Sequence, residues 1–228
     1  MDKKYRFIFL FFVLILLLVP IDFRRYFAAL LAGDNQSWTL HFHLMAMTLW
    51  CLMLIAQPIL IAKKKHKIHK IIGRVSWVLV PIILVSIWLV IRHSFFRMEA
   101  HLSIEQNMQQ VFFPFSQMLL FGAFYLLAIL NTHNSRIHMR YIIVSSVSLL
   151  GPTVGRINFS SVGLGSLDMD LWIMNLFLIG FILYDLVNRK QYLPYYMGLG
   201  AYAQMHWGYY SLSSTELWQL VAKKLLLL

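Results

Sequence analysis

Long apolar stretches alternate with short polar segments along nearly the whole chain. A helix needs about 20 apolar residues to cross a hydrocarbon core of about 30 Å, and seven stretches approach that length. We expect transmembrane helices near 5–25, 38–62, 75–95, 110–132, 141–161, 170–188 and 193–211. The remaining segment, 212–228, has the pattern of a short amphipathic helix at the membrane interface. The pattern therefore predicts an all-α, polytopic transmembrane helix bundle of about seven spans, in a single domain covering 1–228.

Composition supports this interpretation. The chain has 228 residues, of which 60% are hydrophobic and 13% are charged, whereas soluble domains average about 45–50% apolar and about 25% charged residues. A formal net charge of +11 would also fit a nucleic-acid-binding protein. However, the basic residues cluster beside apolar stretches, as the positive-inside rule predicts for membrane proteins. We therefore expect the lipid bilayer, and no nucleic acid, as a partner.

The distribution of Lys and Arg predicts the orientation. If the N-terminus is cytoplasmic, Asp2 and Asp185 are the only acidic residues on the inner side. The basic residues on that side are then Lys3, Lys4, Arg6, Lys63, Lys64, Lys65, Lys67, Lys70, Arg74, Arg136, Arg140, Arg189 and Lys190. The basic residues on the outer side are Arg24, Arg25, Arg92, Arg97, Lys223 and Lys224. This asymmetry predicts a multi-pass protein with a cytoplasmic N-terminus.

Two basic turns share a short motif. The first lies at 63–74 (KKKHKIHKIIGR) and the second at 133–140 (HNSRIHMR), and each contains a [Lys/Arg]-Ile-His core. Aligning the two cores also aligns Ser76 with Ser145. Both turns have the same predicted topology, so the sequence suggests a parallel repeat of a helical hairpin. The alternative is a chance match between two basic cytoplasmic turns.

Nine histidines lie mostly near the ends of the predicted helices. The inner group is His66, His69, His133 and His138, and the outer group is His41, His43, His93, His101 and His206. Neutral imidazole is the commonest metal ligand, and two such layers could each hold haem b between facing helices. The haem ligands would be His43 with His93 or His206 in the outer layer, and His69 with His138 in the inner layer. The alternative is that these rings simply reach headgroups or water from helix ends.

The predicted helix at 141–161 carries Arg156 inside the bilayer. A buried arginine needs an acid, a carbonyl or an anionic ligand as a partner. We expect a substrate-binding site formed by Arg156, Asn158 and Asn175, with His206 nearby, if the protein is a small transporter or handles lipids. The alternative is an arginine that extends outward to the headgroups.

Zinc chemistry is a further hypothesis. His93, His101 and His206, together with an aspartate, would hold Zn²⁺ and a nucleophilic water in a membrane metallohydrolase. The sequence contains no P-loop, no CxxC pair and no HExxH helix. The pattern therefore assigns no catalytic residue and leaves open whether the protein is an enzyme.

The His and basic motifs resemble those of an uncharacterised bacterial multi-pass membrane family, a domain of unknown function with His-rich basic cytoplasmic turns. The matching residues are His41 or His43, His66, His69, Gly73, Arg74, His138, Arg156, Trp218 and Ala222. The resemblance covers about 38–222. It implies a location in the bacterial inner membrane, and the family has no established activity.

We favour an accessory subunit or partner of a larger membrane complex, or a homo-oligomer, as the function. Aromatic residues make up 15% of the chain, and 12 Met residues add further helix-packing surface. The alternatives are a haem-binding electron-transfer protein, a small transporter or lipid-handling protein centred on Arg156, and a zinc metallohydrolase.

Overall fold

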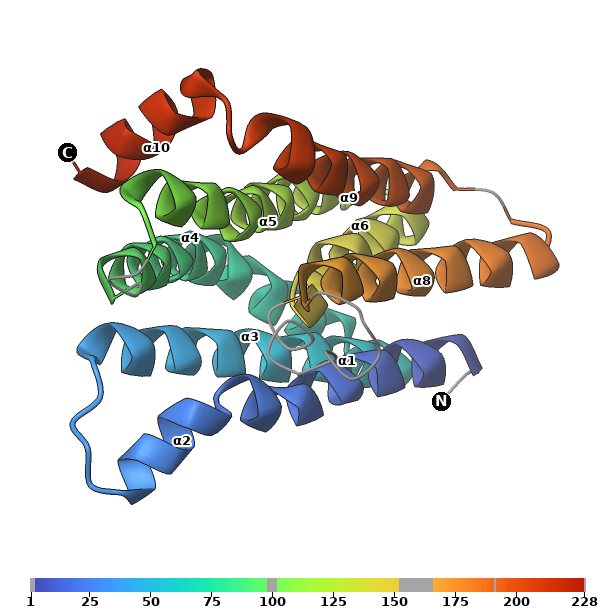
Figure 1. The fold of residues 1–228 in the computed structure, drawn as a ribbon. Helices are drawn as coiled ribbons and strands as arrows, with labels where there is room; N and C mark the ends of the chain where they lie inside the picture. Colours follow the sequence, from blue (N-terminus) through green and yellow to red (C-terminus); the bar gives the residue numbers. More distant parts are fainter. Residues whose placement is uncertain (1–2, 98–101, 152–165, 191, 228) are drawn as a thin grey trace. The chain divides into compact units, whose positions relative to one another are not determined.

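The computed structural model describes residues 3–97, 102–151, 166–190 and 192–227. It confirms the all-α class: helices account for 87% of the structure, and the described residues form nine helices and no strand (Figure 1). The chain divides into two compact units, residues 1–90 and 91–228, whereas the sequence pattern predicts one domain. The boundary falls inside one long helix, α4 (His66–Arg97), and not in a linker.

Unit 1 begins with α1 (Lys3–Asp22) and α2 (Arg24–Leu31). The predicted helix at 5–25 is therefore interrupted, because Phe23 leaves the helical conformation (φ −99°, ψ 16°). α1 packs against α3 (Trp38–Ala62). The buried residues of α1 form an i, i+3, i+4, i+7 stripe, which is the pattern of a helix with one covered face; they are Ile8, Phe11, Phe12 and Ile15.

The first basic turn joins α3 to α4. α3 ends in a Schellman motif, in which the Lys65 N–H donates to Leu60 O (2.8 Å) and the Lys64 N–H donates to Ile61 O (2.9 Å). Lys64 has a φ of 57°, in the left-handed region that this motif requires. α4 then begins at His66, nine residues before the predicted start at 75, because the basic segment continues the helix.

Unit 2 contains five described helices besides the end of α4. They are α5 (Ile104–Leu130), α6 (Ser135–Val147), α8 (Ser166–Val187), α9 (Leu193–Leu212) and α10 (Glu216–Leu227). α6 contacts α5, α8 and α9, and α9 also contacts α5 and α8. α6 is therefore the central element, and it buries Ile143, Val144 and Val147 to 1% exposure or less.

Close packing of α9 on α6 depends on Gly198. A Cβ at this position would lie 2.7 Å from Val144 Cγ1 and 3.5 Å from Leu178 Cδ1. The first distance is too short for two carbon atoms, whereas the second is an ordinary van der Waals contact. Glycine at this position therefore allows α9 to lie this near to α6.

The C-terminal segment forms α10, within the predicted interfacial segment at 212–228. α10 packs on α5, and it buries Trp218, Ala222 and Leu226 on one face. The Trp218 indole donates from Nε1 to the Met108 carbonyl (2.8 Å) and contacts the Phe112 ring edge to face (4.9 Å between centroids). Trp218 and Ala222, two of the residues in the family resemblance, thus belong to the packing face of this helix.

Within the described part of the chain, three helices are long and apolar enough to cross a membrane: α3, α4 and α5. Two shorter apolar segments, 6–21 and 172–187, add to them. α6 has only 13 residues, or about 20 Å at 1.5 Å per residue, so it covers only the first part of the predicted span at 141–161. The second half of that predicted span lies largely outside the described residues.

Candidate functional site

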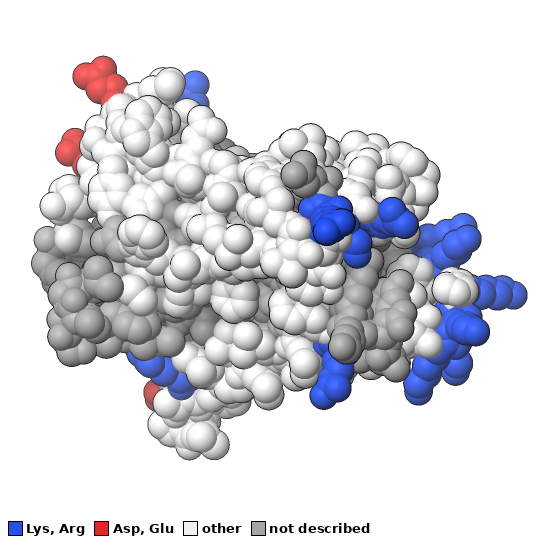
Figure 2. Space-filling view, turned by 90° about the vertical axis from the view of Figure 1, so that its right-hand side faces the viewer, with Lys and Arg blue, Asp and Glu red and all other residues white. Residues whose placement is uncertain are grey.

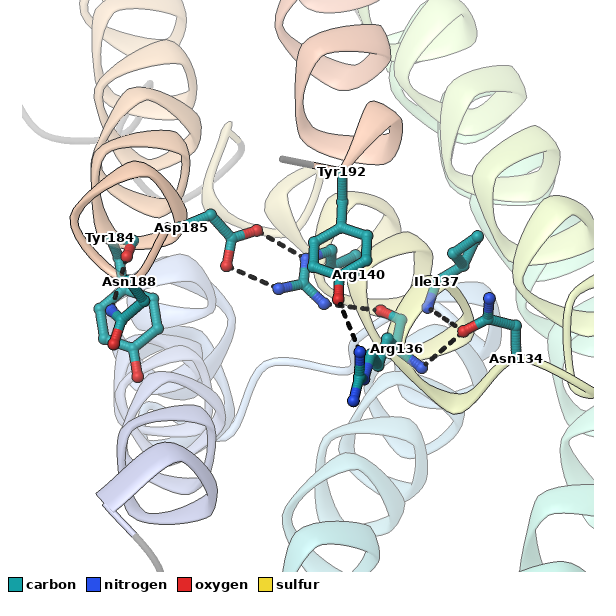
Figure 3. Close-up of polar contacts among 8 residues, drawn as sticks. All are labelled: Asn134, Arg136, Ile137, Arg140, Tyr184, Asp185, Asn188 and Tyr192. Carbon is teal, nitrogen blue, oxygen red and sulfur yellow. Dashed lines mark hydrogen bonds and ion pairs between the residues drawn. The ribbon is translucent and has the colours of Figure 1, made fainter. Parts of the chain in front are cut away.

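The best-developed polar site of unit 2 lies where α6, α8 and the start of α9 meet (Figure 3). Arg140 of α6 forms a bidentate ion pair with Asp185 of α8. The guanidinium Nε donates to Oδ2 (2.7 Å), and Nη2 donates to Oδ1 (2.6 Å). The two side chains are only 4% and 6% exposed, so this is a buried and geometrically well-matched pair.

Further contacts fix the Arg140 guanidinium. Its Nη1 donates to the Arg136 carbonyl (2.8 Å), one turn earlier in α6. The Tyr192 ring covers the guanidinium, with Cζ 3.7 Å from the ring centroid, and the Tyr195 ring lies 5.6 Å from Cζ. Aromatic faces attract a guanidinium held at such distances. Three helices therefore supply the partners of this single cation.

The residues around the pair are ordered by local hydrogen bonds. Asn134 caps α6, and its side-chain oxygen accepts from the N–H groups of Arg136 (3.2 Å) and Ile137 (3.4 Å). Arg136 in turn donates from Nη1 to the Tyr192 hydroxyl (3.4 Å). Figure 3 shows this chain of contacts running from Asn134 through Arg136 to Tyr192.

The chemistry of this cluster is that of a structural junction. Both Asp185 oxygens accept from Arg140, so the carboxylate is not positioned to act as a base. The guanidinium is held by a carboxylate, a carbonyl and a ring. A pair of this kind fixes how helices meet.

Sequence analysis did not identify this pair as a site, although it placed both partners on the cytoplasmic side. The feature of the sequence that could have indicated this ion pair was Asp185 itself. Apart from Asp2, it is the only acidic residue among the predicted inner segments. A lone carboxylate at the end of an apolar helix needs a cationic partner. Arg140 is one of the basic residues predicted on the same side of the membrane.

A second polar cluster lies at the end of α6. Ser145, Ser146 and Ser148 are all buried. The Tyr202 hydroxyl donates to the Val144 carbonyl (3.0 Å) and is also hydrogen-bonded to Ser148 Oγ. Tyr202 thereby binds the carbonyl and hydroxyl groups exposed where α6 stops, which stabilises the helix end within the core.

The predicted substrate site lies only partly in the described chain. Arg156 and Asn158 are outside the described residues. Asn175 lies on α8, and His206 lies half-buried on the neighbouring helix α9. α8 and α9 contact each other, and the Phe181 ring of α8 stacks on the Tyr195 ring of α9 (5.3 Å between centroids).

The predicted haem ligands are divided between the two units. His43 and His69 belong to unit 1, whereas His93, His138 and His206 belong to unit 2. His138 Nδ1 lies 2.7 Å from the Ala128 carbonyl, and a carbonyl accepts only. His138 therefore carries a proton on Nδ1.

His43 has the same tautomer for a different reason. Its Nδ1 lies 3.0 Å from Ser86 Oγ, and the Ser86 hydroxyl donates to the Ile83 carbonyl (2.7 Å). Because the hydroxyl proton is engaged, Ser86 accepts from Nδ1–H of His43. Metal-bound histidines commonly donate Nδ1–H to such a partner and bind the metal through Nε2.

Among the residues that the structure describes, no group of three or more His, Cys, Asp or Glu side chains is arranged to hold a metal ion. His101, one of the three proposed zinc ligands, lies outside the described residues. Of the three histidines proposed as zinc ligands, His93 on α4 and His206 on α9 lie within the described residues.

Comparisons of the chain with protein-family models, with curated proteins and with solved structures found no match.

Proposed function

We propose that the protein is a multi-pass membrane protein with about seven spans and a cytoplasmic N-terminus, which acts as an accessory subunit or partner within a membrane complex. The bacterial inner membrane and the resemblance to the uncharacterised multi-pass family are part of this proposal. The support begins with the surfaces of the long helices. Only 28%, 28% and 33% of the most apolar stretches of α3, α4 and α5 are buried.

The exposed surface is mostly uncharged, as Figure 2 shows for one face of the molecule. Exposed large apolar side chains occur on every long helix, for example Leu49, Val85 and Leu126. Apolar surface of this extent requires lipid or other helices around it, because water would be an unfavourable solvent. The accessory-subunit, haem-binding, transporter and metallohydrolase hypotheses all require a location in the membrane.

The outward face of α9 carries the observation that favours a partner over lipid alone. Gly200, Ala203 and Gln204 are exposed there, next to Trp207 at 63% exposure. A Cβ on Gly200 would meet nothing within 4 Å, so packing within the chain does not require glycine. Small residues with a polar side chain are typical of helix–helix contacts in membranes.

Gly200→Leu tests this proposal. The variant should fold normally, because the added side chain enters open space, but it should block close approach of a partner helix. We expect a complex recovered from native membranes in mild detergent to dissociate to the monomer. Gly180→Leu is the matched control, because Gly180 is also exposed with open space around it but lies on α8. A wild-type protein that is already a clean monomer would contradict the proposal.

Haem binding is a second candidate, favoured by the Nδ1–H tautomers of His43 and His138. Each of these two residues would present Nε2 to a haem iron. Bound haem would supply one-electron chemistry, and the chain would hold and orient it. Absorption spectra of oxidised and reduced protein should then show a Soret band that is weakened in His138→Ala and retained in full in His133→Ala, an exposed neighbour.

A further inference from the structure

We infer that the N-terminal part of α4 binds the headgroups of anionic phospholipids. This inference rests on the proposed membrane location, and it assigns a ligand to the first basic turn. The surface consists of a cationic stripe, Lys67, Lys70 and Arg74, and an apolar stripe, Ile68, Ile71, Val75 and Val78. We refer to the two together as the α4 basic face.

Helical spacing produces the two stripes. Lys67, Lys70 and Arg74 are related by i, i+3 and i+7, which places them on one side of the helix. All three side chains are exposed. The apolar stripe begins one residue later with nearly the same spacing, so it follows the cationic stripe along its length.

The apolar stripe is uncovered within the structure. Ile71 is 53% exposed, Val75 is 55% exposed and Val78 is 65% exposed. Trp77, which is 58% exposed, lies at the same level, and Trp is enriched where a membrane meets water. This surface has the composition of a helix that passes from headgroups into acyl chains.

The charges of this turn have no acidic neighbours in sequence. No Asp or Glu occurs between Asp34 and Glu99, so α3 and the described part of α4 contain none. The first turn of α4 carries cations where the helix dipole favours anions, which is a local electrostatic conflict. An anionic headgroup would relieve both the repulsion among the cations and this conflict.

Lysine and arginine are suited to this ligand. Their aliphatic stems can lie along the apolar stripe while the charged ends reach phosphate groups. Phosphatidylglycerol offers a net negative charge, whereas phosphatidylcholine is zwitterionic and offers none. Juxtamembrane Lys and Arg clusters attract anionic lipids in this way.

The test is the selectivity of the full-length protein for spin-labelled lipids. The protein is reconstituted in phosphatidylcholine bilayers with a trace of spin-labelled phosphatidylglycerol or spin-labelled phosphatidylcholine. Electron paramagnetic resonance then reports the fraction of each label that is immobilised at the protein surface. We expect the phosphatidylglycerol label to be preferred at low salt and the preference to weaken at high salt.

Two charge-matched variants locate the effect. Lys67→Gln with Lys70→Gln removes two charges from the α4 basic face, and Lys223→Gln with Lys224→Gln removes two exposed charges from α10. The first variant should weaken lipid binding at the site by about fivefold per lysine. The second should retain the wild-type preference.

The outcomes separate this inference from the proposed function. Immobilised lipid without a phosphatidylglycerol preference would overturn the inference while supporting a membrane-embedded protein. A preference that is equally reduced by both variants would also overturn it, since the effect would then be one of net charge. No immobilised lipid of either kind would contradict the membrane location itself.

Discussion

The two basic turns share a core motif, but their cations have opposite environments. In the first turn, Lys67, Lys70 and Arg74 are exposed. In the second turn, Arg140 is buried and paired with Asp185. The alignment that pairs Ser76 with Ser145 places Ile71, at 53% exposure, opposite Arg140. Aligned positions of the two turns thus carry an exposed isoleucine in one case and a buried, paired arginine in the other.

The local structures of the two turns are nevertheless similar. Ser76 Oγ donates to the Gly73 carbonyl (2.5 Å), and Ser145 Oγ donates to the Ile142 carbonyl (2.9 Å). Both are i to i−3 bonds at aligned positions, and both serines are buried. The difference between the turns therefore arises from long-range partners and not from the helix itself.

Asp185→Asn should produce the largest effect. It removes the charge partner of a buried arginine, and such losses cost about 3–5 kcal/mol. The measurement is the free energy of unfolding in mild detergent. Glu216→Gln is the matched control, because Glu216 is exposed at the start of α10. Unchanged stability of Asp185→Asn would show that the ion pair does not hold α6 to α8.

Tyr192→Ala should have the next largest effect. The ring lies 3.7 Å from Cζ of Arg140, and removing a partly desolvated cation–π contact costs about 1–2 kcal/mol. Tyr192→Phe keeps the ring and should behave like the wild type in the same unfolding measurement. Equal destabilisation by both variants would assign the effect to the hydroxyl that contacts Arg136.

Asn134→Ala removes the side-chain cap of α6 and should cost about 1 kcal/mol. Ser135→Ala, at the adjacent exposed position, serves as the control because Ser135 is not the capping residue. A loss of stability in the control as large as that in Asn134→Ala would show that capping is not what stabilises the start of α6.

Ile71→Arg should have the smallest effect. It introduces arginine at the position aligned with Arg140, but the first turn has no acidic residue nearby in sequence to pair with it. Exposed substitutions of this kind usually change stability by less than about 0.5 kcal/mol. Clear stabilisation in the unfolding measurement would contradict this expectation. It would show that an arginine at this position stabilises the protein without an acidic partner.

Hydropathy predicted the helical class correctly because the apolar stretches are long and continuous. It extended the first helix through Phe23 to residue 25, because an apolar residue such as Phe23 gives no sign in the sequence that the helix is interrupted there. It also started α4 too late, since lysines at 67 and 70 resemble a loop although they are compatible with a helix.

The contact between Arg140 and Asp185 could not be predicted from the pattern because 45 residues separate the partners. The charge distribution predicted only that both residues lie on the cytoplasmic side. Which helices are neighbours depends on packing, such as the close approach at Gly198. The predicted site at Arg156 and Asn158 lies outside the described residues, so it stays a prediction.

The central claim is that both basic turns lie on the cytoplasmic side. Because Cys51 is the only cysteine, Cys51→Ala gives a background for single cysteines at the exposed positions His66, His133 and Asn35. A membrane-impermeant maleimide should label His66→Cys and His133→Cys in inverted vesicles only, and Asn35→Cys in intact cells only. Labelling of the two turns from opposite sides would contradict the account.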